Sequence, residues 1–341
     1  MKKRISALFC AMLFALTGCG KPVAQAEPQP QEPVQQEEQQ TEPAPVEAGY
    51  EDGLVLRVAS LKGPTSMGLA PLITDENEHY QFDMYTAADE IVPLIVKGEI
   101  DAALVPANLA ATLYQKTKGQ VAVMNINTLG VLEAISASDA ADLTALKGKT
   151  IYTTGKGTTP ESVLRYLVQK SGLQWEDLNV EFKTEATEVV AALKADPAAA
   201  AILPQPFATV ATQQIDNMRI QFSLTDLWRN VSDDDSELVT GVTLVRKAFA
   251  EEHAAALAQF QLDSAESVAY VNSHPTEAAE QIGSLDIVKA GVAKLAIPRC
   301  NLVSMTGMEM RAALGGYLNA LYDYDPNLIG GALPELDFYL E

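Results

Sequence analysis

Three loops rich in glycine, hydroxyl and lysine side chains contain the residues of this sequence best suited to bind a small molecule. They span residues 61–68, 155–159 and, with less glycine, 204–207, each between a predicted strand and a predicted helix. Loops after the carboxyl ends of strands are the usual ligand sites of open α/β sheets. Free amides at a helix N-terminus can bind a carboxylate, sulfonate or phosphate, or can hydrogen-bond a neutral heterocycle. The spacing alone leaves open the alternative that these loops are tight turns with helix caps.

Residues typical of catalysis and of metal binding are sparse. The three histidines, His79, His253 and His274, are not spaced as metal ligands, and no cysteine can join them. The three aspartates at 233–235 lack the glycine and the distal glutamate of a calcium loop, so we interpret them as a solvated loop. The glycines at 155–157 lack the third glycine of a dinucleotide fingerprint. We therefore predict no enzyme activity, no metal and no cofactor.

The elements that would position these loops follow a strand–helix alternation that occurs twice. Apolar runs bounded by turn signals predict strands near residues 54–60, 80–85, 101–105, 121–125 and 130–136. The pattern restarts at residue 146 and predicts strands near 150–154, 179–182, 199–203 and 239–245. This order predicts mostly parallel sheets covered by helices, in two α/β lobes of similar architecture.

The first 49 residues are predicted not to belong to the fold. Residues 1–18 combine a basic start with an apolar run too short to span a bilayer, as in a signal peptide. Two small residues precede Cys19, which resembles a bacterial lipobox and implies cleavage before Cys19 and lipid attachment to it. The alternative is an ordinary signal peptide with a coincidental cysteine. Residues 19–49, rich in Pro, Gln and Glu, predict a disordered tether on the lipidated cysteine.

Length and charge exclude several classes of function. The chain has 341 residues, a net charge of −21 and 48% hydrophobic residues. This apolar content can form a core, so wholesale disorder is excluded. The acidic balance argues against binding to nucleic acid or docking on anionic lipid. Once Cys10 and Cys19 are assigned to the signal peptide and the anchor, Cys300 remains alone, and we interpret it as a small buried hydrophobe.

Four motifs follow one another along the predicted folded part. They are SLKGPTSMGL at 60–69, GEIDAALVPAN at 98–108, LKGKTI at 146–151 with GKGTTP at 155–160, and LPQPF at 203–207. Together with the tail around 297–331, they resemble ABC-transporter substrate-binding proteins of the nitrate/sulfonate/taurine and thiamine-precursor type. The resemblance covers about residues 53–341. It departs from the family at Gln205, where an acid is usual, and at Pro71, where the first helix either starts near Met67 or is kinked.

The resemblance implies a type II periplasmic-binding-protein fold, in which two α/β lobes are joined by two crossing hinge segments with a ligand cleft between them. The implied crossings lie near 136–140 and 236–241. The implied lobes are residues 50–137 with 240–341 for lobe 1, and residues 138–239 for lobe 2. Ligand contacts carried over by position are Lys62, Gly63, Pro64, Thr65, Ser66, Met67, Asp89, Asn108, Gly157, Thr158, Thr159, Gln205, Thr240 and Gly241.

The function implied by the resemblance is that of an extracytoplasmic lipoprotein on the outer face of the bacterial cell membrane. Such a protein captures a small organic or oxyanion solute and delivers it, as a monomer, to the permease and ATPase subunits of an ABC importer. Two alternatives remain open at this point. One is an enzyme on the same fold, similar to chorismate-dehydrating or pyrimidine-making enzymes. The other is a lipoprotein that senses a ligand.

Overall fold

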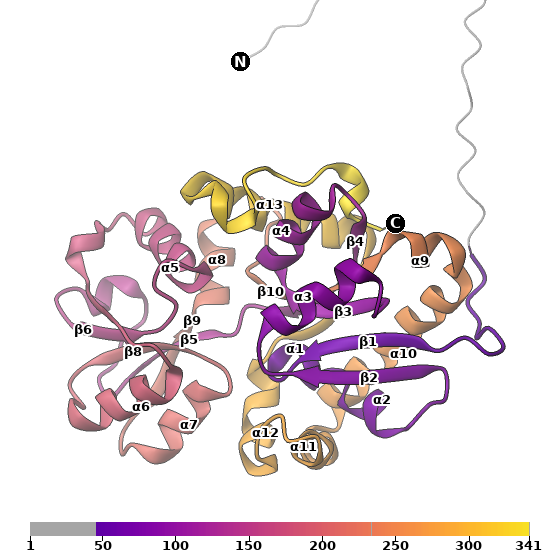
Figure 1. Cartoon of the computed structure of the whole chain (residues 1–341). Helices are drawn as coiled ribbons and strands as arrows, with labels where there is room; N and C mark the ends of the chain where they lie inside the picture. Colours follow the sequence, from indigo (N-terminus) through magenta and orange to yellow (C-terminus); the bar gives the residue numbers. More distant parts are fainter. Residues whose placement is uncertain (1–45, 233, 341) are drawn as a thin grey trace, which may run out of the picture. The chain divides into compact units, whose positions relative to one another are not determined.

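The computed structural model describes residues 46–232 and 234–340 (Figure 1). The predicted signal peptide, Cys19 and most of the predicted tether lie outside these residues. All the described residues belong to one compact unit. Among them, no helix combines the length and the apolar content that crossing a membrane requires.

The described residues form two β-sheets. The first has six strands in the order β11-β4-β10-β3-β1-β2. Their bounds are β1 (Leu56–Leu61), β2 (Tyr80–Tyr85), β3 (Ala102–Pro106), β4 (Val121–Leu129), β10 (Val239–Arg246) and β11 (Leu302–Met305). The second has five strands in the order β7-β6-β8-β5-β9. Their bounds are β5 (Leu132–Ser136), β6 (Thr150–Thr153), β7 (Asn179–Phe182), β8 (Ala200–Pro204) and β9 (Arg219–Ser223).

Both sheets are mixed, so the prediction of mostly parallel sheets is wrong. β1 is parallel to β2 and β3, and β6 is parallel to β7 and β8. β4, β5 and β10 are antiparallel to each strand they pair with. These three strands carry the chain between the sheets, which explains why they run against their neighbours.

Helices cover both faces of each sheet, and the strand residues alternate between them. In β1 and β3, Ala59 and Ala103 pack in the apolar cluster that contains α3 and α4, whereas Val58 and Leu104 pack towards α2 and α10. The helices of the first lobe are α1 (Pro64–Met67), α2 (Ala70–Thr74), α3 (Ala88–Lys97), α4 (Ala107–Thr117), α9 (Lys247–Glu252), α10 (Ala254–Ser273), α11 (Pro275–Ser284), α12 (Ala290–Ala296) and α13 (Gly307–Tyr324). Those of the second lobe are α5 (Thr159–Lys170), α6 (Ala186–Ala195), α7 (Phe207–Gln214) and α8 (Leu224–Val231).

The two-lobed α/β architecture predicted from the sequence is confirmed, but one crossing is not where we predicted it. The chain leaves the first sheet after Leu129 and enters the second at Leu132, so the crossing is Gly130 and Val131. The expected crossing near 136–140 lies too late in the chain, because residues 132–136 already form β5 and pair with β8 and β9. The return runs between α8 and β10 and overlaps the segment expected near 236–241.

The first helix of the chain is divided at the position that Pro71 had called into question. α1 ends at Met67, and α2 begins at Ala70 with Pro71 in its first turn, where proline is tolerated. Ser267 of α10 satisfies the backbone at this break. Its hydroxyl accepts a hydrogen bond from the Leu72 amide at 3.3 Å and donates one to the Gly68 carbonyl at 2.9 Å.

A buried carboxylate at the start of β3 ties that strand to β1 and β10. Asp101 is only 3% exposed, and it accepts hydrogen bonds from Nε of Arg57 at 2.9 Å and from Nη2 of Arg246 at 2.5 Å. Burial by itself would raise the pKa of Asp101, but the hydrogen bonds from the two arginines outweigh it and hold the pKa below its usual range. Three strands of the first sheet therefore share one ionised group.

We expect D101N to destabilise the fold by about 3 kcal/mol at pH 7, because both arginines lose their charged partner. The folded-state pKa of Asp101 is depressed, so its contribution is present above the unfolded-state pKa of about 4 and is lost as the pH falls through the folded-state value. Urea unfolding at pH 7 and pH 3 should show the variant and the wild type converging in acid. D286N, which alters the 95% exposed carboxylate paired with Lys62, is the control. Equal losses of unfolding free energy in D101N and D286N at pH 7 would contradict the role of Asp101 as the shared partner of the two arginines.

Candidate functional site

A cavity of about 340 Å³ lies between the two lobes. The first lobe contributes Pro106, Asn108 and Tyr317, and the second contributes Thr154, Thr158, Thr159, Pro160, Val163 and Pro204. The crossing contributes Val131 and the return contributes Leu238, while Leu132 begins β5, and Val239 and Thr240 begin β10. A molecule in this cavity would therefore contact both lobes and the segments that join them.

The cavity lies where three strands end. β3 ends at Pro106 and β8 ends at Pro204, and both prolines line the cavity. β6 ends at Thr153, directly before the lining residue Thr154. Ligands of open α/β sheets bind outside the carboxyl ends of strands, so this cavity has the position expected of a binding site.

Four of the residues expected to bind ligand line the cavity, namely Asn108, Thr158, Thr159 and Thr240. Asn108 lies in the first turn of α4, and its amide donates to the Leu328 carbonyl at 3.4 Å. Thr158 precedes the first residue of α5, and its hydroxyl donates to the Gly155 carbonyl at 2.8 Å. The loop after β6 is therefore held in shape by its own hydrogen bonds at the cavity wall.

The other expected residues are not among the described residues that line the cavity. They are Lys62, Gly63, Pro64, Thr65, Ser66, Met67, Asp89, Gly157, Gln205 and Gly241. In the loop after β1, the Ser66 hydroxyl lies 2.7 Å from that of Ser60, and Met67 is fully buried beside the Cys300 sulfur at 3.9 Å. Lys62 forms an ion pair with Asp286 at 3.1 Å. In this structure, the groups of the loop are engaged with the protein.

Two further residues of the expected set, Gly241 and Asp89, have structural roles. A Cβ on Gly241 would lie 2.7 Å from Oδ1 of Asn127 and closer still to Thr65, so only glycine fits there. Asp89 is exposed in the first turn of α3, where a carboxylate interacts favourably with the helix dipole. Both residues have structural roles that account for them without a ligand.

A buried carboxyl group that we did not predict lies directly after the lining residue Leu132. Glu133 is 3% exposed, and its Oε1 accepts from Nη1 of Arg299 at 3.4 Å. Its Oε2 has no hydrogen-bond partner, and neither has the Nε2 of Gln205, whose Oε1 accepts from Thr209 at 2.8 Å. Burial raises the pKa of Glu133 to about 7 against the lowering effects of Arg299 and of the neighbouring Gln205 side chain. The signal in the sequence was a single charged residue inside the apolar run 131–135.

The crossing itself is fixed by hydrogen bonds from the loop before β11. The side-chain amide of Asn301 donates to the Gly130 carbonyl at 2.6 Å, and the Leu129 amide donates to the Asn301 carbonyl at 3.0 Å. Asn301 belongs to the segment that follows α12 of the first lobe. The back wall of the cavity is therefore attached to the first lobe.

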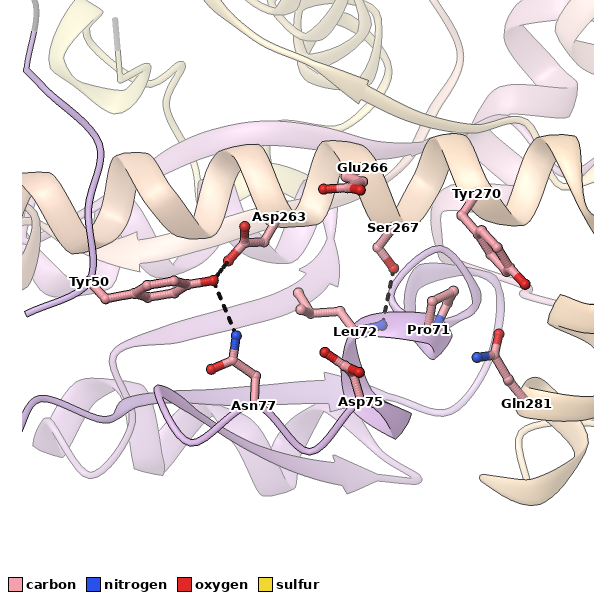
Figure 2. A pocket seen from close by; sticks show the side chains of 10 residues that line it. All are labelled: Tyr50, Pro71, Leu72, Asp75, Asn77, Asp263, Glu266, Ser267, Tyr270 and Gln281. Carbon is pink, nitrogen blue, oxygen red and sulfur yellow. Dashed lines mark hydrogen bonds between the residues drawn. The ribbon is translucent and has the colours of Figure 1, made fainter.

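A second cavity, of about 380 Å³, lies within the first lobe (Figure 2). Its lining includes Asp263, Glu266 and Tyr270 of α10, and Pro71 and Leu72 of α2. Its residues precede β4 or follow β10, so the second lobe takes no part in it. A molecule bound there would not couple to a movement between the lobes.

The histidines and the remaining cysteine do not form a reactive site. His253 pairs with Glu51 at 2.7 Å, and His79 stacks on the ring of Tyr50. His274 stacks on the ring of Tyr270. Within residues 46–232 and 234–340, no group of three His, Cys, Asp or Glu side chains could hold a metal ion. Burial raises the pKa of Cys300 to about 12, so its thiol stays protonated at neutral pH.

Comparison with known proteins identifies the family. The sequence matches the family described as NMT1/THI5 like over residues 89–278, which is more than half of the chain. The chain belongs to this family, as its motifs had indicated. No curated protein matches the sequence.

Solved structures share the fold. An ABC transporter from Parabacteroides distasonis is 23% identical, with a TM-score of 0.72 over 84% of this chain and 99% of that one. The periplasmic aliphatic sulphonate binding protein SsuA from Escherichia coli is 17% identical, with a TM-score of 0.66 over 84% and 92%. The alkanesulfonate-binding protein SsuA from Xanthomonas axonopodis pv. citri, bound to MOPS, is 16% identical, with a TM-score of 0.56 over 82% and 94%. The type II periplasmic-binding-protein fold is thus confirmed.

The raised pKa of Glu133 predicts a specific pH dependence of stability. Wild-type stability should fall as the pH rises from the unfolded-state pKa, about 4.3, to the folded-state pKa of about 7, because ionisation is costly in the folded state. E133Q stays uncharged, so relative to the wild type it should gain roughly 2 kcal/mol between pH 5 and pH 8. Urea unfolding at both pH values measures this difference. E309Q, at an exposed site on α13, should show no such gain, and a pH-independent effect of E133Q would contradict the prediction.

Proposed function

We propose that this protein is an extracytoplasmic solute-binding lipoprotein that captures a small organic or oxyanion solute between its lobes and delivers it to an ABC importer. The observation that carries the proposal is the cavity between the lobes, lined from both sides by loops at strand ends. Membership of the NMT1/THI5-like family supports it. The likeness in fold to binding proteins of ABC transporters supports it as well.

Closure of the lobes would couple binding to delivery. A solute in the cavity would contact Asn108 of the first lobe and Thr158 of the second. Both contacts form together best when the lobes are closed, so the solute shifts the equilibrium towards the closed state. The crossing at residues 130–131 and the return before β10 serve as the hinges. The closed protein then docks on the permease and ATPase subunits.

The anchor belongs to the same proposal. Lipid on Cys19 holds the protein on the outer face of the cell membrane, and residues 19–49 act as the tether. Multiple acyl chains give durable anchoring, because each buried methylene contributes about 0.8 kcal/mol. The protein acts as a monomer, without nucleic acid.

We propose binding without catalysis. Glu133, whose pKa is raised by burial, is not among the described lining residues. Burial also raises the pKa of the lining residue Tyr317, so its phenol stays protonated at neutral pH. The lining offers threonine hydroxyls and the amide of Asn108 among apolar side chains, which suits recognition of a ligand.

A thermal-shift screen tests the proposal on the purified protein. The panel holds sulfonates, nitrate, pyrimidines, thiamine and riboflavin precursors, and aromatic acids. We expect at least one solute to raise the Tm by mass action and to reduce the radius of gyration in small-angle scattering. The proposal is wrong if no solute stabilises the protein and no compaction occurs. Turnover of a stabilising solute would favour an enzyme.

A substitution in the cavity wall links this binding to the site. T158V changes a lining residue and removes a hydroxyl that donates to Gly155 but can still accept a hydrogen bond from a solute. The change should weaken binding of the stabilising solute about three- to tenfold, the worth of one hydrogen bond. Isothermal titration calorimetry measures the change. The control is T187V, in the first turn of α6, which contributes no described lining residue to the cavity. Unchanged affinity in T158V, or an equal loss of affinity in T187V, would show that the solute does not bind in this cavity.

A further inference from the structure

The cavity between the lobes has no charged side chain among its described lining residues. Its polar groups are the hydroxyls of Tyr317 and of four threonines, together with the amide of Asn108. The remaining lining residues are aliphatic residues and prolines. An anion moved into such surroundings loses its hydration, and no lining cation compensates for the loss.

One backbone amide at the start of α5, that of Gly157, is already bound by the protein itself. The Gly157 amide donates a hydrogen bond to Oε2 of Glu161 at 2.8 Å. Oε1 of Glu161 accepts from Nε of Arg165 at 2.8 Å, and the residue is 7% exposed. Burial by itself would raise the pKa of Glu161, but these hydrogen bonds outweigh it and keep the pKa below its usual value. The carboxylate is therefore ionised at neutral pH.

Prolines remove further donors from the cavity wall. Pro106 precedes the first residue of α4, Pro160 is the second residue of α5, and Pro204 ends β8. All three line the cavity, and proline has no backbone N–H. Helix N-termini bind oxyanions through free backbone N–H groups. Around this cavity, proline lowers the number of those groups and Glu161 binds the one that belongs to Gly157.

The lysines of the predicted ligand loops do not supply the missing charge. Lys62 is paired with Asp286 at 3.1 Å, and Lys156 is exposed. Neither is among the described residues that line the cavity. A negatively charged solute would thus meet no lining cation, while the Glu161 carboxylate, paired with Arg165, follows the lining residue Pro160 in the chain.

We infer that the Glu161 carboxylate occupies the place at the start of α5 where an oxyanion of a ligand would bind, and that the cavity selects an uncharged organic solute over an anion of the same size. The inference rests on the proposed function and narrows its solute to uncharged compounds. These compounds present a mostly apolar surface and few hydrogen-bonding groups, to match the lining.

A matched pair of probes tests the selection. Benzenesulfonamide and benzenesulfonate are similar in size and shape, but only the second is charged at pH 7. Calorimetry on the purified wild-type protein should give at least about tenfold tighter binding of the sulfonamide. E161A removes the carboxylate and frees the Gly157 amide. It should shift the preference towards the sulfonate by at least about tenfold, the worth of a hydrogen bond to a charged group.

Glu188 provides a matched control. It is the third residue of α6, as Glu161 is of α5, and its carboxylate accepts from the Thr184 amide at 2.9 Å. α6 contributes no described residue to the cavity lining. E188A should therefore lose a similar helix cap while leaving the preference between the probes unchanged. If E161A does not fold, E161Q takes its place, and a smaller shift in the same direction is expected.

Three results would overturn the inference. One is tighter binding of the sulfonate than of the sulfonamide by the wild-type protein. Another is a Glu161 variant that keeps the wild-type preference between the two probes, or an E188A variant whose preference shifts as much as that of E161A. The third is no binding of either probe to any of these proteins. In each case the proposed function still stands if the solute screen finds a ligand that closes the lobes, whereas a screen without such a ligand removes the proposed function itself.

Discussion

At Gly130 the chain passes from one lobe to the other through a space too small for any side chain. A Cβ there would lie 2.5 Å from Cδ2 of Leu238 and closer still to Oγ1 of Thr225. Leu238 belongs to the return crossing, so the two crossings pack directly against each other. Asn301 fixes the Gly130 carbonyl from the first lobe at 2.6 Å. With the crossings held together, the ends of β3, β6 and β8 face one another, and the cavity forms between them.

Two of the contacts between the lobes have opposite character. On one side, Trp228 of α8 stacks on Tyr166 with ring centroids 4.4 Å apart and meets Tyr317 of α13 at 5.7 Å. Trp228 is 1% exposed, so separating this contact would expose a large apolar area. The other contact is the half-satisfied pair of Glu133 and Arg299. A carboxyl with a pKa raised by burial regains water when it is exposed, so opening costs less at this pair than at the aromatic contact.

Local patterns were enough to predict most strands and the two similar lobes. Successive residues of β1 and β3 point to opposite faces of the sheet, and both faces are buried, so these strands are visible in the sequence as apolar runs. They could not assign β5 to a sheet, since an apolar run does not tell which strand it pairs with. The buried loop after β1 shows the same limit. Ser66 and Met67 resemble ligand contacts in the linear sequence, but their partners include Cys300, more than two hundred residues away.

The charge of the solute that the cavity can hold depends on where a few backbone amides point, and the sequence does not give their direction. Thr158 and Glu161 have the spacing of a capping box, so an interaction at this helix start could have been predicted from the sequence. What the spacing does not give is the partner. Gly157 adopts a φ of +72°, and the Glu161 carboxylate binds the amide of this glycine. That amide belongs to the loop beside the cavity. In the inference drawn above, Glu161, an ordinary helix-capping residue, therefore occupies an anion-binding position and disfavours a charged solute.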